Sequence, residues 1–373
     1  MSVSKPKALT WRVTEIPTGT TKEQLVHFFE YEDRDRISVN SLCPDASGGN
    51  ELTATLLYQP HPDRPDEGPK FTHGKPRDVS IDKDFEHWTP LYCPPAGTII
   101  AADIIAITGL SGHAFGSWAY SEENMWLRDD VYKFAPNARI LTYGYNTPLV
   151  GPNMSIVRMS DLSDTFYENL INMREDSKCE QRPIIFIGHS LGCMIIKKAM
   201  IIARERNVVS SRLPVRCIIF LAAPHRGMDV TALQNVVKNS PPEQLVEELR
   251  PESETLKLLN EGFSRTAQDI DILTCYETRP TKTMAFDEAK QKWTRSGEST
   301  MILDPSSANQ YWPKEKRILA DADHSSIAKL KKNKTIFSNV RAAISRALIP
   351  TAQISREERN NNAQGHNWVS SSS

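Results

Sequence analysis

The stretch that decides the fold is "IIFIGHSLGCMIIKKAM", residues 184–200. Its first part is a continuous apolar run, which is typical of a strand in a parallel sheet whose two faces are both covered by helices. The run ends in the pentapeptide GHSLG, residues 188–192, and a helix-like apolar pattern follows directly. A G-x-S-x-G pentapeptide alone is a weak signal, so its meaning must come from these surroundings.

The junction of strand and helix has the context of a nucleophile elbow, a sharp turn that raises a serine hydroxyl above the edge of a sheet. In such a turn the strand and the helix pass so closely that the residues two before and two after the serine must be small. Gly188 and Gly192 satisfy this requirement. We therefore predict that Ser190 is a nucleophile, and that a base and a carboxylate lie elsewhere in the chain, because a serine hydroxyl is weak without a base.

The region around this junction, about residues 79–348, alternates strand-like and helix-like patterns. This alternation predicts an α/β fold with a doubly wound, mostly parallel sheet, and the nucleophile elbow within it indicates the α/β-hydrolase type. The expected strands lie at 103–108, 138–143, 183–188, 217–223, 271–277, 299–304 and 317–322. The expected helices lie at 160–175, 191–206, 229–238, 242–261 and 325–347.

The first part of the chain, residues 1–60, has a different pattern. Strand-like segments surround one helix-like segment in the order β-α-β-β, which predicts a small α+β unit of ferredoxin-like or RRM-like type. Residues 61–78 are rich in proline, glycine and charge and are expected to be a linker. The polar tail, residues 349–373, is expected to be disordered.

Composition argues against several classes of function. The formal net charge of the 373 residues is −1, so no overall field attracts nucleic acid or an anionic membrane. The six cysteines include no CxxC pair and no metal-ligand spacing, which indicates reduced thiols and no metal site. The N-terminus lacks an apolar signal segment, and no run approaches the ~18 apolar residues that a membrane span needs. An intracellular, cytoplasmic protein is expected.

His324 is the predicted general base. It lies in "LADADHSS", after the last expected strand, and in α/β-hydrolases the histidine follows both the serine and the acid along the chain. His189 is adjacent to Ser190 and is expected to point away from it. His113 and His225 are expected to line or brace the site.

Two carboxylates compete for the role of the acid that orients this histidine. Asp304 ends one expected strand, at the commoner position for the acid, and Glu277 ends the preceding one, at a position that some lipases use. An oxyanion hole requires two backbone N–H groups, for which we predict Leu191, directly after the nucleophile, and Leu110, in the glycine-rich segment after the first core strand.

Several segments together resemble the serine-active-site-containing α/β-hydrolase family, a lipase-like group related to the DUF676 proteins. The resemblance covers about residues 79–335 and rests on "DIIAITGLSGHAFGSW", "MWLRDDVYKFAPNARILTYGYNT", "IIFIGHSLGCMIIKKAM", "LAAPHRG", "YETRPT" and "DADHSSIAK". The chain is most similar to fungal members, which often stand at the N-terminus of NACHT or NB-ARC receptors. The "ET" pair after the strand is a family hallmark, which favours Glu277 as the acid.

The resemblance implies a cofactor-independent esterase or lipase that acts on a carboxylic ester, with a role in lipid remodelling or fungal cell-death signalling. It also implies peripheral contact with a membrane of the mitochondrion or the endoplasmic reticulum. The alternative is a non-catalytic signalling module that keeps the fold and has lost turnover.

RNA binding by the N-terminal unit is disfavoured, because residues 1–95 carry 11 Lys+Arg against 15 Asp+Glu. We therefore expect no nucleic-acid partner, and the protein partner of this unit stays unknown.

Two segments, 112–137 and 225–263, fall where this fold places its cap. The first is rich in aromatic residues. These side chains either pack the first helix onto the sheet or line an apolar channel for an acyl chain, in which case His113 and His225 would add polar contacts near the ester.

Overall fold

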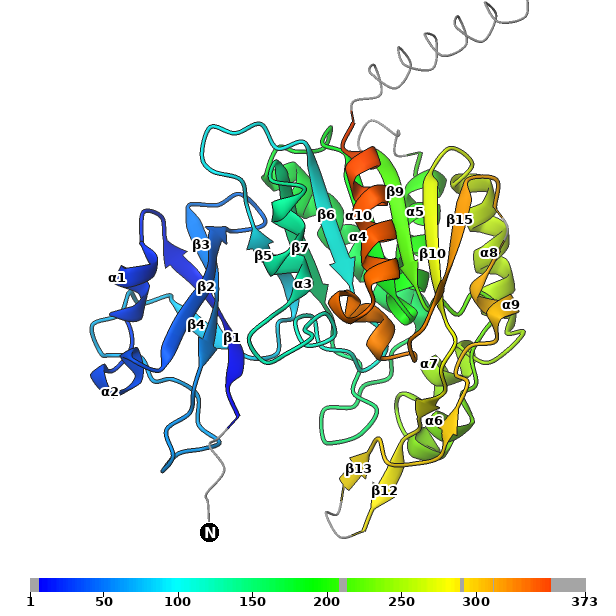
Figure 1. Ribbon diagram of the computed structural model, residues 1–373, viewed down its shortest axis with the longest axis horizontal. Coiled ribbons are helices and arrows are strands. Elements are labelled where there is room, and N and C mark those ends of the chain that lie inside the picture. The colour runs from blue at the N-terminus through cyan, green and yellow to red at the C-terminus, as the bar shows by residue number, and fades with distance from the viewer. Residues whose placement is uncertain (1–6, 208–212, 289–291, 311, 350–373) are drawn as a thin grey trace, which may run out of the picture.

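The computed structural model of the chain describes residues 7–207, 213–288, 292–310 and 312–349. A small antiparallel sheet near the N-terminus lies beside a larger, helix-covered sheet (Figure 1). The tail for which we predict disorder lies outside the described residues, except for its first residue. No helix in the described part of the chain has both the length and the apolar character that crossing a bilayer requires.

The larger unit is built on a seven-stranded sheet with the order β15-β10-β9-β8-β6-β7-β5. All neighbouring strands pair in parallel except the edge strand β5, which runs antiparallel to β7. The doubly wound, mostly parallel sheet predicted from the sequence is confirmed. Its strands are β5 (His87–Tyr92), β6 (Ala102–Ile107), β7 (Ala138–Gly144), β8 (Ile184–His189), β9 (Val215–Leu221), β10 (Asp271–Glu277) and β15 (Glu315–Ala320).

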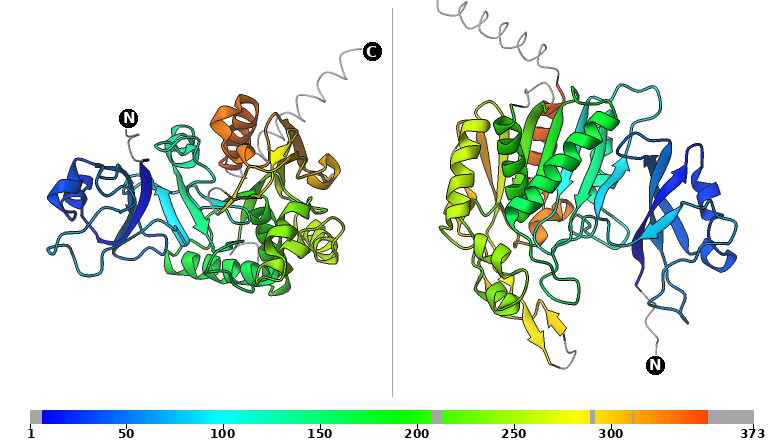
Figure 2. Two further views of the ribbon diagram at one scale, coloured as in Figure 1. Left: turned by 90° about the horizontal axis from the view of Figure 1, so that it is seen from below. Right: turned by 180° about the vertical axis from the view of Figure 1, so that it is seen from behind.

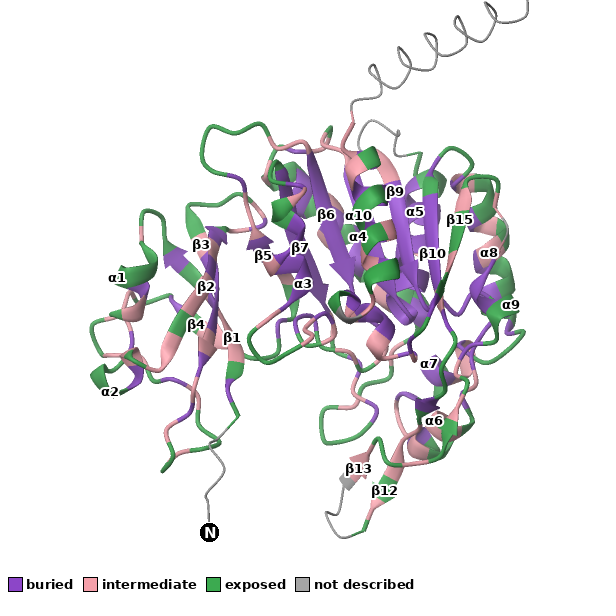
Figure 3. Cartoon of the chain, in the orientation of Figure 1, coloured by how far each residue is buried: buried purple, intermediate pink, exposed green. Residues whose placement is uncertain are grey.

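Helices cover both faces of this sheet (Figure 2). One face carries α4 (Met159–Asp176), α5 (Leu191–Glu205) and α8 (Glu254–Thr266), and the other carries α3 (Trp126–Asp129) and α10 (Lys334–Ala347). The central strands are therefore buried along their whole length, whereas the helices expose one side (Figure 3). This double cover explains why these strands are continuous apolar runs in the sequence. Short 3₁₀ turns lie at Val131–Lys133, Ser326–Ala328 and Leu330–Lys332.

Two predicted elements differ from the structure. The strand expected at 299–304 does not join the sheet, because β15 pairs directly with β10. The connection between β10 and β15 instead holds two short antiparallel pairs and one helical turn: β11 (Thr281–Lys282) with β14 (Ser299–Thr300), β12 (Ala285–Asp287) with β13 (Lys292–Thr294), and α9 (Pro305–Ala308). The helix expected at 242–261 is divided into α7 (Glu243–Glu248) and α8, since Pro251 cannot continue a helix; α6 (Thr231–Val237) precedes them.

The N-terminal unit is a four-stranded antiparallel sheet with the order β2-β3-β1-β4. Its β-α-β-β beginning is as predicted, with elements β1 (Leu9–Pro17), α1 (Lys22–Val26), α2 (Tyr31–Arg34), β2 (Ile37–Pro44), β3 (Glu51–Tyr58) and β4 (Ser80–Asp82). The fourth strand lies beyond the expected boundary at residue 60 and inside the region assigned to the larger unit. A three-residue strand is too short to show a periodic pattern, which is why the sequence did not reveal it.

The segment expected to be a linker, residues 61–78, is folded onto this small sheet. The ring of Phe71 stacks on Phe29 with 4.7 Å between centroids, and the Lys70 backbone N–H donates to the buried carboxylate of Asp33 over 2.9 Å. The segment thus takes the place of the second helix of a ferredoxin-like unit, and residues 59–79, all of them described, contain no helix.

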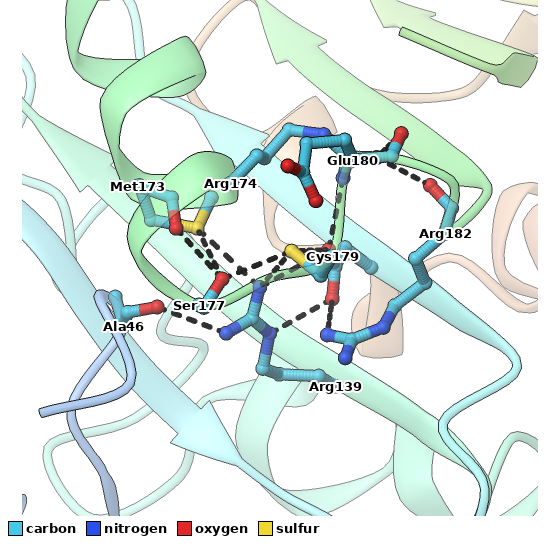
Figure 4. A network of polar contacts seen from close by, with 9 residues as sticks. Ala46, Arg139, Met173, Arg174, Ser177, Cys179, Glu180 and Arg182 are labelled. Carbon is cyan, nitrogen blue, oxygen red and sulfur yellow. Dashed lines mark hydrogen bonds and ion pairs between the residues drawn. The ribbon is translucent and has the colours of Figure 1, made fainter. Parts of the chain in front are cut away.

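Hydrogen bonds join the two units. The Arg12 guanidinium of β1 donates to the Glu86 carbonyl and, over 3.0 Å, to the Thr89 hydroxyl of β5. Near the amino end of β7, Arg139 donates to the Ala46 carbonyl of the small unit over 3.0 Å (Figure 4).

The same guanidinium, Arg139, pairs with the buried carboxylate of Asp103, which also receives Arg174 and Arg182. Burial by itself would raise the pKa of Asp103, but the guanidinium groups of Arg139 and Arg182 hold it below its usual value. Asp103 and these arginines therefore form a charged cluster at the amino ends of the strands of the large sheet.

Candidate active site

Ser190 occupies the turn between β8 and α5. Its backbone angles, φ 51° and ψ −122°, are ones that residues other than glycine rarely adopt. A Cβ at Gly188 would lie 2.9 Å from the Cys193 Cα, and one at Gly192 would lie 2.3 Å from the Ile107 carbonyl oxygen. Both positions therefore exclude any side chain. The strained serine and the two close approaches form a nucleophile elbow.

Three predicted residues meet at this turn. The Ser190 Oγ lies 2.9 Å from the His324 Nε2, and the His324 Nδ1 lies 2.7 Å from the Glu277 Oε2. All three residues are buried, with exposed fractions of 3% for Ser190, 8% for His324 and 1% for Glu277. Their order along the chain is serine, acid, histidine, as the sequence analysis expects.

The sheet brings the carboxylate and the imidazole together. Glu277 is the last residue of β10 and pairs in register with Ala320, the last residue of β15, so the loop after β15 returns His324 to it. The second oxygen of Glu277 accepts the Leu303 backbone N–H over 3.1 Å. Asp304, the competing acid, is exposed and caps the first turn of α9 by accepting the Ser306 N–H over 2.8 Å. The carboxylate that contacts the histidine is therefore that of Glu277.

Two further side chains hold the main chain of His324, and sequence reasoning missed both roles. The Thr281 Oγ1 accepts the His324 backbone N–H over 2.9 Å, and the His189 Nε2 lies 2.8 Å from the His324 carbonyl oxygen. The ring centroids of His189 and His324 lie 5.3 Å apart. Burial lowers the pKa of His189 to about 3, with a smaller contribution from His324. Contacts of side chains with a loop backbone leave no signature in the sequence.

The backbone positions expected to form an oxyanion hole flank Ser190. Leu191 is the first residue of α5, where backbone N–H groups have no acceptor within the helix. Leu110 follows β6, the strand that pairs with β8, so it lies at the same edge of the sheet. A Cβ at the preceding Gly109 would lie 2.8 Å from the Ser190 Cβ, which shows how closely this loop passes the serine.

The other histidines are engaged elsewhere. The His113 Nε2 lies 2.6 Å from the Lys83 carbonyl oxygen. His225 is fully buried, with its Nδ1 3.2 Å from the Lys197 Nζ. Burial lowers the pKa of Lys197 to about 7. Each of these two histidines thus contacts a group of the protein itself.

The aromatic residues of segment 112–137 pack in the core. Phe115, Trp118 and Trp126 are at most 4% exposed, and the Trp126 Nε1 donates to the Ala328 carbonyl over 2.9 Å. Of the two explanations open from the sequence, the structure supports packing for these side chains. In the part of the chain that the structure describes, no group of three or more His, Cys, Asp and Glu side chains is arranged to hold a metal ion.

A mostly parallel seven-stranded sheet, a serine elbow after β8 and a histidine after the last strand define an α/β-hydrolase fold. No protein-family model matches the chain. Among curated proteins, the chain is 25% identical to Protein SERAC1 of Danio rerio over 259 residues, which cover 63% of this chain and 39% of SERAC1. It is 28% identical to Protein SERAC1 of Mus musculus over 203 residues, covering 49% and 31%.

The chain is therefore a distant relative of SERAC1 and matches less than half of the length of these proteins. This supports the lipase-like resemblance, whereas an association with NACHT receptors receives no support.

The solved structures that resemble the chain are distant. Phospholipase PlaB from Legionella pneumophila has a TM-score of 0.40 at 18% identity and covers 57% of this chain and 45% of its own. A lipase-esterase related protein from Clostridium acetobutylicum has a TM-score of 0.38 at 10% identity, covering 69% and 99%. The fold assignment rests on the strand order and the elbow described above.

Proposed function

We propose that this protein is a serine hydrolase that cleaves carboxylic esters, most suitably those of lipids. The observation that carries the proposal is the continuous hydrogen-bonded line from the Ser190 Oγ to the His324 Nε2, over 2.9 Å, and from the His324 Nδ1 to Glu277, over 2.7 Å. A nucleophile, a base and an orienting acid within hydrogen-bond reach are the arrangement that acyl transfer requires.

In this mechanism Glu277 accepts the Nδ1–H of His324 and so leaves the Nε2 lone pair facing the Ser190 hydroxyl. His324 takes the hydroxyl proton while the Ser190 Oγ attacks the ester carbonyl, and then gives this proton to the leaving alcohol. Water attacks the acyl-enzyme with the same base, which releases the acid and restores the serine. Glu277 remains ionised and stabilises the imidazolium in both steps.

The backbone N–H groups of Leu110 and Leu191 are the proposed oxyanion hole. The tetrahedral intermediate carries a negative charge on the former carbonyl oxygen, and donors fixed beside Ser190 stabilise that charge without reorganising. The N-terminus of α5 adds the positive end of a helix dipole at the same place.

The lipid part of the proposal is supported by apolar side chains on the connections at the carboxyl edge of the sheet. Val150 and Ile156, between β7 and α4, are 40% and 82% exposed. Phe286 and Met301, between β10 and β15, are 45% and 37% exposed. Both connections project from the end of the sheet at which Ser190 lies (Figure 1). Apolar residues around the approach to a nucleophile suit an acyl chain or a lipid surface.

Labelling with a fluorophosphonate tests the nucleophile. Purified wild-type protein is compared with Ser190→Ala, and circular dichroism verifies that both are folded. We expect labelling of the wild type alone. Equal labelling would refute the assignment of Ser190, and a folded wild type that does not label would favour the non-catalytic signalling module.

The acyl chain is tested with p-nitrophenyl esters of increasing length. We expect kcat/KM to rise from two carbons to about eight, because each buried methylene contributes about 0.8 kcal/mol. A strict preference for acetyl would remove the lipid assignment and leave the serine mechanism intact.

A further inference from the structure

We propose that His189 is a positioning residue: in its neutral form it acts with Thr281 to clamp the main chain of His324 on both sides. This inference rests on the proposed serine mechanism and adds to it the device that holds the base in place. His189 is the x before the serine in the G-x-S-x-G pentapeptide, a position at which the elbow by itself requires no particular side chain.

The hydrogen bond determines the protonation state of His189. The His324 carbonyl oxygen can only accept, so the His189 Nε2, 2.8 Å away, carries the proton. The other ring nitrogen, Nδ1, is buried and has no hydrogen-bond partner among the residues that the structure describes. It faces the loop of Gly109, where a Cβ would lie 3.2 Å from it. With no acceptor at Nδ1, a second proton would be buried without compensation, and the ring stays neutral.

The opposite side of the same residue is held by Thr281. Its Oγ1 accepts the His324 backbone N–H over 2.9 Å, and the threonine is 5% exposed. Three side chains thus hold three parts of His324. His189 of β8 holds its carbonyl group, Thr281 of β11 holds its backbone N–H, and Glu277 of β10 holds its ring. His324 itself belongs to no strand or helix, so these contacts replace the support that regular structure gives elsewhere.

Neutrality matters as much as the hydrogen bond. The centroids of the His189 and His324 rings are 5.3 Å apart, and His324 becomes an imidazolium during each proposed proton transfer. A positive charge on His189 would oppose that step at close range in a buried site. The neutral ring of His189 donates a hydrogen bond to the His324 carbonyl without adding a positive charge. A lysine or an arginine at this position would donate but would also add the charge.

Gln and Met at position 189 form a matched pair, because they have similar size and only Gln carries an N–H donor. We expect His189→Met to lower kcat by about 10- to 100-fold with little change in KM, because a small displacement of a catalytic group has effects of this size. His189→Gln is expected to restore most of this loss. Equal kcat values for the two variants at equal melting temperature would overturn the clamp.

Thr281→Val and Thr281→Ser test the other side in the same way, since only Ser keeps an acceptor. Thr55→Val is the control, because it removes a buried hydroxyl, hydrogen-bonded to Ser41 over 2.6 Å, in the small unit. We expect Thr281→Val to lower kcat and Thr55→Val to leave it unchanged. The loss in the His189→Met, Thr281→Val double variant should differ from the product of the single losses, because both contacts hold one residue. Independent, multiplicative effects would contradict a shared clamp.

A measurement without substrate separates this inference from the proposed function. The Nδ1–H of His324, hydrogen-bonded to Glu277 over 2.7 Å, should give a low-field proton resonance. We expect this resonance in the wild type and in His189→Gln, and its broadening or loss in His189→Met. Loss of the resonance only in His189→Met supports the clamp even if the wild type fails to hydrolyse any ester. If the wild type labels with fluorophosphonate and His189→Met keeps the wild-type resonance unchanged, the clamp alone is refuted.

Discussion

Replacing Glu277 by Gln should separate the two carboxylates that the sequence left in competition. Gln has the size of Glu, and its amide oxygen can still accept the Leu303 N–H, as the Oε1 of Glu277 does over 3.1 Å. Its NH₂ group then faces the Nδ1 of His324, where Oε2 now accepts over 2.7 Å. Because an amide NH₂ can only donate, Nδ1 must accept, and the ring proton moves to Nε2.

The consequence for the serine follows from this change of tautomer. With its proton on Nε2, His324 can no longer accept the hydroxyl proton of Ser190, and the carboxylate that stabilises the imidazolium is gone. A substitution of this kind in a serine triad lowers kcat by about 10⁴-fold, which corresponds to a barrier increase of about 5 kcal/mol. We expect a loss of this size for Glu277→Gln.

Asp304→Asn is the matched control, since it makes the same chemical change at the rival position. Asp304 caps α9, and Asn is about as good a cap as Asp, so we expect kcat and the melting temperature to stay close to wild type. Both variants are assayed with a p-nitrophenyl ester and a fluorophosphonate, and circular dichroism reports folding. The reasoning is refuted if Asp304→Asn is the inactive variant and Glu277→Gln keeps its activity.

Three further predictions concern stability. Asp103→Asn should lower the free energy of unfolding, measured in urea, by about 3–5 kcal/mol, because it leaves buried guanidinium groups without their partner. Glu168→Gln, which changes an exposed pair with Arg206, is the control and should lower it by less than about 1 kcal/mol. In the folded protein the pKa of Lys197 is lowered to about 7, so above that pH the unfolded chain binds more protons than the folded chain. The free energy of unfolding should therefore rise by about 2 kcal/mol from pH 7 to pH 9. Lys197→Met should abolish this rise; a rise of equal size in the variant would contradict it. A protein that begins at residue 83 should melt at a lower temperature and still react with fluorophosphonate, because the small unit has a hydrophobic cluster of its own and adds Ala46 to the cluster of the large unit; failure to fold would show that the units depend on each other.

The sequence was sufficient to predict the large sheet because its strands are buried on both faces and therefore read as apolar runs. It was also sufficient for Ser190 and His324 as candidates, since the elbow needs two small neighbours and the histidine has a fixed place in the chain order. The same patterns were insufficient where an element is short or half-buried. Residues 80–82 form a strand without a detectable period, and residues 299–304 resemble a strand without joining the sheet.

The choice between Glu277 and Asp304 shows why the acid could not be settled by pattern. Each residue follows an apolar run, and a run becomes a strand of the main sheet only if it finds a neighbour there. In the structure β10 pairs with β9 on one side and β15 on the other, so no edge of β10 is left for residues 299–304. Glu277 therefore ends a strand beside the histidine loop, whereas Asp304 caps a helical turn.

The connection between β10 and β15 contacts both the acid and the base. It supplies the Thr281 hydroxyl to the His324 N–H near its start and the Leu303 N–H to Glu277 near its end. These two points are tied together, because Thr281 pairs with Thr300 in the β11–β14 ladder. The ladder therefore links the contact that holds the backbone of His324 to the contact that holds the side chain of Glu277. Ser190 lies directly after β8, outside this connection, so a separate contact must control the distance from the Ser190 Oγ to the His324 Nε2. His189, fixed to the same strand end as the serine, is placed to control it.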